Sequence, residues 1–365
     1  MRDSREDRAE RFAVLDGMRA AAALVVITDH VPSEMLQALL PGRYLAVDFF
    51  FALSGFVLAH IYQPRLAQGW SFWRFMQARV IRLYPLYLLA TLIGAALAFA
   101  YTWKGWISAS FAQDAASAFF SALYLPTPPA LSVHANEPFP FNGPAWSLFF
   151  ELLINVVFAL IALRVRWRGL IAILAVNAAL LIWTAFAFGK LDSGFQWSNF
   201  LGGFPRVGYA FFAGVFIYRL RAIWRAPAIP PWLAFLALLL VFMVPAIGVW
   251  RPVWDVFAAT VIFPLLVMVA ANARASGLFL KLCVAGGALS YGFYVLQVPV
   301  RDWTNLLISL KAPHANIPGL ALVALVAGLT IAAAAFLNTL YDVPVRRWLT
   351  QRAATKAAAL GATPS

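Results

Sequence analysis

The main pattern along the chain is a series of long apolar stretches separated by short polar ones. Six of the stretches contain no Asp, Glu, Lys or Arg, and they approach or exceed the roughly 18 residues that a helix needs to cross a bilayer. They are residues 83–103, 169–189, 226–250, 256–273, 282–300 and 312–341. Each is predicted to form a transmembrane helix.

Four further apolar stretches are interrupted by charged residues: 20–40, 44–62, 143–163 and 199–218. An ionisable group in the hydrocarbon is costly unless it faces the protein interior or a water-filled cavity, so functional residues are expected on these four helices. The two sets together predict an all-α, polytopic integral membrane protein with about ten transmembrane helices.

Composition supports this class of protein. The chain is 63% hydrophobic and 12% charged, whereas soluble domains are about 45–50% apolar and about 25% charged. A soluble fold of 365 residues could not cover so much apolar surface. Cys283 is the only cysteine, so neither an intrachain disulfide nor a thiolate metal site is expected, and we expect no metal cofactor.

The net charge of +13 predicts topology rather than nucleic-acid binding. A nucleic-acid site would gather basic residues on one surface, whereas here they gather in alternate loops, as the positive-inside rule describes. We assign both termini to the cytoplasm, with residues 1–18 and 343–365 as cytoplasmic segments. Seven of the 28 basic residues then face outside: Arg43, Lys104, Lys190, Arg206, Arg251, Arg301 and Lys311.

The sequence favours one membrane domain over residues 1–365, and its N-terminal region has no pattern of a cleaved signal peptide. The longest segment between spans, residues 104–142, is predicted to be extracytoplasmic and continues into a Pro-rich run that cannot be regular helix. Both an ordered lid over an external opening and a plain connector fit this loop. His134 and Glu137 within it are expected to be solvated.

Arg19 and His30 are eleven residues apart on the first predicted span. In a helix they return to within about 20° of the same face and lie roughly 16 Å apart along the axis. If Arg19 marks the cytoplasmic boundary, His30 lies near the middle of the bilayer. An imidazole there suits a general base that takes a proton from a hydroxyl. The alternative is a histidine that only packs against a neighbouring helix.

Glu151 is the one acidic residue in the stretch 143–163 and is expected near the depth of His30. It would either support the imidazole or an acceptor hydroxyl, or pair with an arginine. Arg79 and Arg82, with Arg74 before them, share a helix face and offer forked donors that suit phosphate oxygens. Ordinary positive-inside anchors would look the same.

Several small or polar side chains also lie in the predicted spans. Ser54 and Gly55 would either allow close helix packing or admit a narrow acyl-pantetheine arm. Other polar groups would either join helices or bind the acceptor. These are Asp48, Trp146, Ser147, Ser290, Tyr291 and Tyr294.

Six strings occur in a fixed order: RFAVLDGMRAAAALVVITDH, VDFFFALSGFVLAH, RFMQARVIRLYPLY, PAWSLFFE, LSYGFYVLQVP and DVPVRR. Taken together, they resemble the acyltransferase 3 family of integral membrane acyltransferases over nearly the whole chain. Gln297 stands where many members have a histidine, and Asp342 where a glutamate is common. The chain resembles the stand-alone form, without the hydrolase-like domain that some members append.

The resemblance implies a multi-pass protein of the bacterial inner membrane. Its donor would be a cytoplasmic acyl-CoA, with acetyl as the expected group. Its acceptor would be a hydroxyl of a surface polysaccharide, a lipid-linked sugar or another glycosylated product. Arg19 and His30 correspond to the family's Arg-His pair, Arg79 and Arg82 to its Arg-x-x-Arg element, and Glu151 to the acid of its Trp-Ser-Leu-x-x-Glu motif.

Our mechanistic hypothesis joins these residues. Arg79 and Arg82, with Arg19, would bind the phosphates of coenzyme A near Ser54 and Gly55, and His30 would deprotonate the acceptor hydroxyl while Glu151 supports the imidazolium. Direct transfer and an acyl-enzyme on His30 or Ser54 both fit the sequence. Membrane lipid is a further partner, and a homodimer is compatible with the sequence.

The alternative from another class is a proton-coupled transporter or flippase, because buried Asp, His and Glu also form proton relays. The chain lacks the inverted repeat and the paired broken helices that transporters often show. The ordered strings favour the enzyme.

Overall fold

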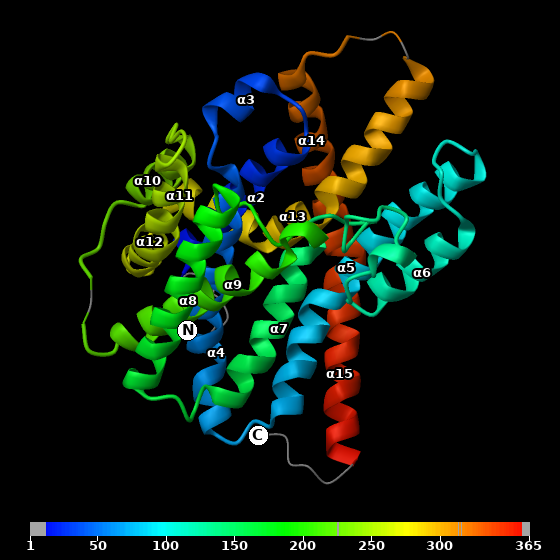
Figure 1. The fold of residues 1–365 in the computed structure, drawn as a ribbon. Coiled ribbons are helices and arrows are strands. Elements are labelled where there is room, and N and C mark those ends of the chain that lie inside the picture. The colour runs from blue at the N-terminus through cyan, green and yellow to red at the C-terminus, as the bar shows by residue number, and fades with distance from the viewer. Residues whose placement is uncertain (1–11, 225, 313, 315, 360–365) are drawn as a thin grey trace.

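The computed structural model of the chain describes residues 12–224, 226–312, 314 and 316–359, and within these residues all regular structure is helical (Figure 1). The longer helices are α2 (Ala13–His30), α4 (Ala46–Ala67), α5 (Phe72–Trp103), α7 (Ala145–Ile161), α8 (Trp167–Phe188), α9 (Gly203–Leu220), α13 (Gly277–Lys311), α14 (Gly319–Leu337) and α15 (Val343–Ala359). The shorter ones are α3 (Glu34–Leu39), α6 (Phe111–Ala122), α10 (Pro231–Met243), α11 (Trp250–Phe257) and α12 (Phe263–Ala270).

Each of the ten apolar stretches contains a helix, which confirms the prediction of an all-α polytopic membrane protein. Seven helical runs are long and apolar enough to cross a bilayer among the residues described. They are Arg43–Ala67, Phe72–Trp103, Trp167–Phe188, Trp197–Leu220, Trp250–Ala270, Gly277–Lys311 and Gly319–Lys356. The other three helices are shorter, with 18 residues in α2, 17 in α7 and 13 in α10.

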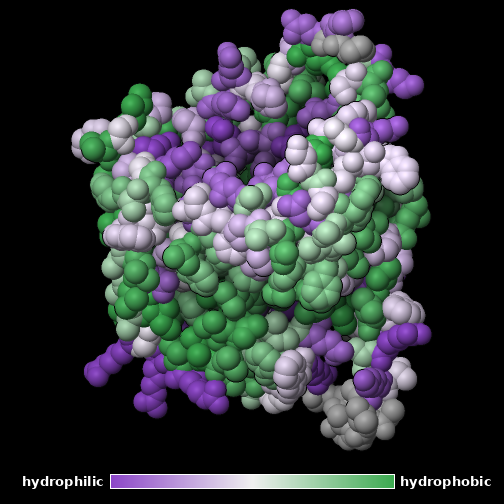
Figure 2. Space-filling model, turned by 45° about the vertical axis from the view of Figure 1, so that its right-hand side comes forward, coloured by the Kyte–Doolittle hydropathy of each residue, from purple (hydrophilic) through white to green (hydrophobic). Residues whose placement is uncertain are grey.

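The surface has the polarity expected of a protein embedded in lipid. Figure 2 shows a broad band of hydrophobic side chains around the middle of the molecule, with hydrophilic side chains above and below it. The upper hydrophilic surface is hollowed. Because hydrocarbon cannot hydrogen-bond to a polar side chain, this band marks the part of the surface that the bilayer covers.

The first helix differs from the predicted span of residues 20–40. It begins at Ala13 and ends at His30, and α3 follows after a short break. Val31 takes an extended conformation, with φ −114° and ψ 123°, because the next residue is Pro32, whose ring disfavours a helical conformation at the position before it. His30 is therefore the last residue of α2. The predicted N-terminal segment 1–18 overlaps this helix, and its first eleven residues lie outside the described part of the chain.

Helices α4 and α9 cross in close contact because each has a glycine at the crossing. A Cβ added at Gly55 would lie 1.9 Å from the carbonyl oxygen of Phe211, and one added at Gly214 would lie 2.1 Å from that of Ala52. No side chain larger than hydrogen fits at either position. The close-packing interpretation of Gly55 therefore matches its position.

A fully buried ion pair joins the same two helices. The guanidinium of Arg206 on α9 donates from Nη2 to Asp48 Oδ2 at 2.7 Å and from Nε to Asp48 Oδ1 at 3.1 Å, and both side chains are 0% exposed. Arg206 also donates to the carbonyl oxygens of Ser193 at 2.6 Å and Tyr44 at 3.1 Å. These contacts compensate a charged group that would be very costly to bury alone.

We expect Arg206→Ala to destabilise the protein by about 3–5 kcal/mol, because the substitution leaves the carboxylate of Asp48 buried without its partner. The midpoint of unfolding in detergent measures the effect. Arg168→Ala is the control, since Arg168 is exposed, and it should change stability by less than about 0.5 kcal/mol. Equal midpoints for the two variants would show that the buried pair is dispensable.

Candidate active site

Two cavities enter the helical domain. The first, here called the His30 cavity, has a volume of about 600 Å³, and the charged residues that line it are Asp29, His30, His134, Glu137, Asp192, Arg206, Arg301 and Asp302. The second, here called the arginine cavity, has a volume of about 1520 Å³, and its charged residues are Arg19, Arg65, Arg74, Arg79, Arg82, Glu151, Arg346, Arg352 and Lys356.

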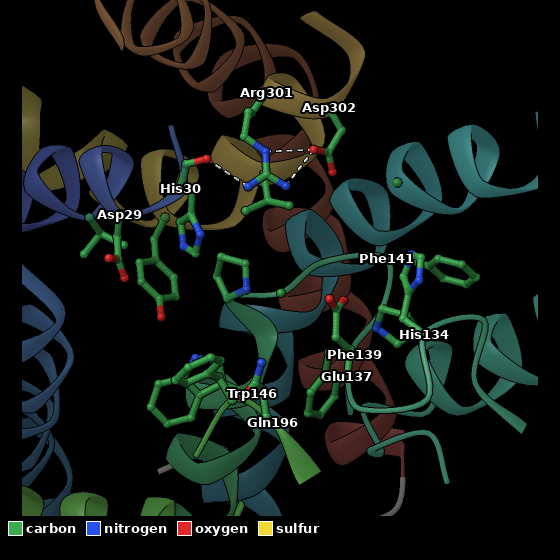
Figure 3. A pocket seen from close by; sticks show the side chains of 18 of the residues that line it. Asp29, His30, His134, Glu137, Phe139, Phe141, Trp146, Gln196, Arg301 and Asp302 are labelled. Atoms are coloured by element: carbon green, nitrogen blue, oxygen red, sulfur yellow. Dashed lines mark hydrogen bonds and ion pairs between the residues drawn. The ribbon is translucent and has the colours of Figure 1, made fainter. Parts of the chain in front are cut away.

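His30 is held at its cavity by the end of α2 and by a residue of α13. Arg301 donates from Nη1 to the backbone carbonyl oxygen of His30 at 3.0 Å, and its Nη2 lies 2.6 Å from Asp302 Oδ1. Asp29, the residue before His30, pairs with Nε of Arg43 at 2.8 Å. The imidazole is half-buried and points into the cavity (Figure 3). The backbone of His30 is thus fixed while its ring remains accessible.

The segment 104–142 forms the opposite wall of the His30 cavity, with His134 and Glu137 facing across it (Figure 3). Both are exposed, as predicted, but they line the cavity rather than a remote surface. The segment is anchored to the helices: Asn142 Nδ2 donates to the carbonyl oxygen of Val295 at 3.2 Å, and Trp197 Nε1 to that of Thr127 at 3.0 Å. This segment is thus more than a plain connector.

The lining of the His30 cavity suits a hydroxyl-rich ligand. Four carboxylates, of Asp29, Glu137, Asp192 and Asp302, can accept hydrogen bonds from hydroxyls. Aromatic rings provide apolar surface between them, from Tyr44, Phe139, Trp146, Phe195 and Tyr294. Polar groups that converge on a space partly walled by apolar rings are typical of sites for small ligands.

The arginine cavity is mainly basic, whereas the His30 cavity has more carboxylates than arginines. Eight basic side chains line it with one acidic side chain, Glu151. Arg79 Nη2 lies 3.0 Å from Glu151 Oε1, and Ser54 Oγ donates to the same oxygen at 2.9 Å. Glu151 is therefore paired with an arginine and does not line the cavity of His30, so its position matches the second of the two interpretations of this residue.

Among the residues that the structure describes, three other arginines of this cavity have only two carboxylates between them as ion-pair partners. Arg82 Nη1 lies 3.9 Å from Asp342 Oδ2, and Arg346 Nη2 lies 2.9 Å from the same oxygen. Arg19 donates to Ser290 Oγ at 2.9 Å and to the carbonyl oxygen of Gly287 at 3.0 Å, and it also pairs with Asp16. The excess of guanidinium groups favours a ligand with several negative charges.

The two cavities meet at Val47 and Tyr294, which line both of them. The hydroxyl of Tyr294 forms a hydrogen bond of 2.6 Å with Ser147 Oγ. Trp146 lines the His30 cavity, whereas the next residue, Ser147, lines the arginine cavity. The hydroxyl pair of Tyr294 and Ser147 therefore lies at the boundary between the two spaces.

The sequence-predicted site residues thus fall into three groups. His30, Trp146 and Tyr294 line the first cavity. The second is lined by Arg19, Ser54, Arg79, Arg82, Ser147, Glu151, Ser290, Tyr291 and Tyr294. Asp48 and Gly55 line neither cavity. Asp48 forms the buried ion pair with Arg206, and Gly55 lies in the close contact between α4 and α9.

Sequence reasoning missed the charged residues around His30. Arg301 was assigned only to the outer side, and Asp29, a charged residue within the stretch 20–40, was given no role. The available indication was a charge within an apolar stretch or directly after one, because such groups need partners within the protein. Within the residues described, no three His, Cys, Asp or Glu side chains come together as ligands for a metal ion.

Comparison with known proteins identifies the family to which the chain belongs. A family described as "Acyltransferase domain", of the acyltransferase 3 type, matches residues 12–338. The chain is 38% identical over 191 aligned positions to "Protein 2 in picA locus" of Rhizobium radiobacter, covering 49% of this chain and 97% of that protein. It is 25% identical over 402 aligned positions to "Acyltransferase MdmB" of Streptomyces mycarofaciens, covering 94% of each. No solved structure matches the chain. On the extent of the family match, the chain belongs to the acyltransferase 3 family of membrane-embedded acyltransferases.

Proposed function

We propose that the protein transfers an acyl group, with acetyl as the expected group, from cytoplasmic acyl-CoA to a hydroxyl of a carbohydrate-bearing acceptor. Its acceptor would be a cell-surface polysaccharide, a lipid-linked sugar or another glycosylated molecule. The observation that carries the proposal is the meeting of two unlike cavities, one with an accessible imidazole and one rich in arginine, at Tyr294. Family membership makes the chain an acyltransferase, so the transporter alternative is set aside.

The donor fits the arginine cavity. Coenzyme A combines several phosphate charges with a long, uncharged pantetheine arm, and the cavity combines excess guanidinium charge with a passage lined by Ser54 and Ser147. Its basic residues belong to the loops that the positive-inside rule assigns to the cytoplasm, where acyl-CoA is made. This assignment also supports residence in a bacterial inner membrane.

The acceptor fits the His30 cavity. Carboxylates and aromatic rings are the groups that bind sugar hydroxyls and the apolar faces of sugar rings, and this cavity has both. Arg301 and Arg206, which the predicted topology places outside, line the same cavity. A surface glycan or lipid-linked sugar would therefore enter from the side opposite to the donor.

In the proposed reaction His30 acts as the general base at the junction of the two ligands. Its imidazole takes the proton of the acceptor hydroxyl as the oxygen attacks the thioester carbonyl carbon. The carbon–sulfur bond then breaks, and the leaving thiolate takes the proton back from the imidazolium. We prefer this direct transfer to an acyl-enzyme, because the cavity that holds the ring and the cavity that would hold the donor share Val47 and Tyr294, so the proposal needs no covalent carrier.

The position of Glu151 changes its proposed role. Its carboxylate accepts from Arg79 and Ser54 in the arginine cavity, so it orients donor-binding groups instead of supporting the imidazolium. Arg19, held against α13 by Ser290 and Gly287, would contribute positive charge to the same ligand. Tyr294 would contact both substrates, because it lines both cavities.

His30→Ala should lower the rate of acyl transfer by about 10²–10⁴-fold, the usual contribution of a general base. Coenzyme A binding should not change, since His30 does not line the arginine cavity. Transfer is measured with radiolabelled acetyl-CoA and membrane glycans. His314→Ala, in an exposed loop, is the matched control and should keep full activity. Unchanged transfer by His30→Ala would remove this residue from the mechanism.

Replacing Arg79 and Arg82 together by alanine should weaken the binding of free coenzyme A by about tenfold or more, because hydrogen bonds to charged groups are lost. Isothermal titration of the purified protein measures the affinity. The control replaces Arg164 and Arg168, which the topology places on the same side but which do not line the cavity. Equal affinity in both double variants would mean that Arg79 and Arg82 are topological anchors only.

Val47→Phe should reduce transfer strongly while leaving coenzyme A affinity intact, because the larger ring narrows the junction of the two cavities. The cost in stability should stay within the roughly 1–3 kcal/mol of an overpacked core. Val47→Ala, which widens the same point, should retain transfer. If the phenylalanine variant binds coenzyme A and transfers acyl groups at the normal rate, the donor does not pass this junction.

A further inference from the structure

The C-terminal helix α15 forms a wall of the arginine cavity. Arg346, Arg352 and Lys356 line the cavity from this helix, and Arg74, Arg79 and Arg82 line it from α5. The two helices lie side by side (Figure 1). The family match ends at residue 338, before α15 begins, and the last string that resembles the family, DVPVRR, ends at Arg347. The basic residues further along α15, Arg352 and Lys356, therefore need an explanation from this structure.

The basic residues that α15 contributes to the cavity lie at two positions along the helix axis, here called the inner level and the outer level. Arg346 belongs to the inner level, because it shares the carboxylate of Asp342 with Arg82. Arg352 and Lys356 follow six and ten residues later, which places them about 9 and 15 Å further along the helix axis. Among the described residues, neither Arg352 nor Lys356 forms an ion pair with a carboxylate, so the outer level keeps its positive charge.

Coenzyme A also carries its negative charge at two levels. The pyrophosphate lies between the pantetheine arm and the adenosine, and a separate phosphate lies on the 3′ oxygen of the ribose. If the thioester points towards Tyr294, the pyrophosphate meets the inner arginines and the 3′-phosphate meets the outer pair. This correspondence rests on the proposed function, since it takes acyl-CoA as the donor.

We propose that Arg352 and Lys356 on α15 bind the 3′-phosphate of the donor and so make the enzyme select 3′-phosphorylated coenzyme A. A donor without this group, such as 3′-dephospho-coenzyme A, would leave the two cations unpaired. If these two residues only fixed the topology by the positive-inside rule, they would not need to line a cavity. Arg347 is the comparison on the same helix: it is exposed, as Arg352 and Lys356 are, but it does not line the cavity.

The test compares the binding of coenzyme A and of 3′-dephospho-coenzyme A by isothermal titration. The wild-type protein should bind coenzyme A at least about tenfold more tightly, as expected when two charged contacts are lost. In the double variant Arg352→Ala with Lys356→Ala, the ratio of the two affinities should fall to near one. The control, Arg347→Ala with Arg274→Ala, removes the same charge from exposed sites outside the cavity and should keep the wild-type ratio.

The outcomes separate this inference from the function on which it rests. If the wild-type protein binds both ligands equally, or if the α15 variant keeps the wild-type ratio, the 3′-phosphate is not bound there although coenzyme A remains a ligand. If the wild-type protein binds neither ligand, acyl-CoA is not the donor and the proposed function itself is wrong. An unaltered unfolding midpoint and affinity for 3′-dephospho-coenzyme A would show that the α15 variant is folded.

Discussion

Two arginines hold α2 against α13, and the positions of both cavities depend on this contact. Arg19 of α2 donates to Ser290 and Gly287 on α13, while Arg301 of α13 donates to the carbonyl oxygen of His30 on α2. The contacts occur in the same order along both helices, so the helices are parallel, and they are joined at two points eleven residues apart on α2. One fixed end faces the arginine cavity and the other faces the His30 cavity.

The break after α2 completes this arrangement. Because Pro32 forces Val31 out of the helical conformation, the helix stops at His30 and the ring lies at the edge of a cavity. At this helix end the ring lines a cavity instead of the packed interior between neighbouring helices. A histidine in such a packed interior could not reach a hydroxyl, whereas a half-buried one can exchange protons with a ligand.

Much of this fold could be predicted, because a long apolar stretch directly indicates a segment that the bilayer surrounds. The ten apolar stretches all contain helices, and the chain's family follows from its ordered strings. The partners of charged residues could not be predicted, since an ion pair such as Arg206 with Asp48 joins residues 158 positions apart. For the same reason two interpretations of Glu151 remained open from the sequence, and only the structure shows Arg79 beside it.

If acyl-CoA is the donor, as proposed, the charge difference between the cavities explains how an anionic donor serves an acceptor on the other side. The eight basic side chains of the arginine cavity would favour the phosphates of coenzyme A, while the four carboxylates of the His30 cavity, which outnumber its two arginines, would disfavour them. Charges in a space with low-dielectric walls interact strongly, so the nucleotide is held back while the uncharged pantetheine arm can advance. Only the neutral thioester then needs to reach the junction at Tyr294. In the proposed function, the acyl group would thus cross the protein without the charged part of its carrier, because the two cavities differ in charge and share Val47 and Tyr294 in their walls.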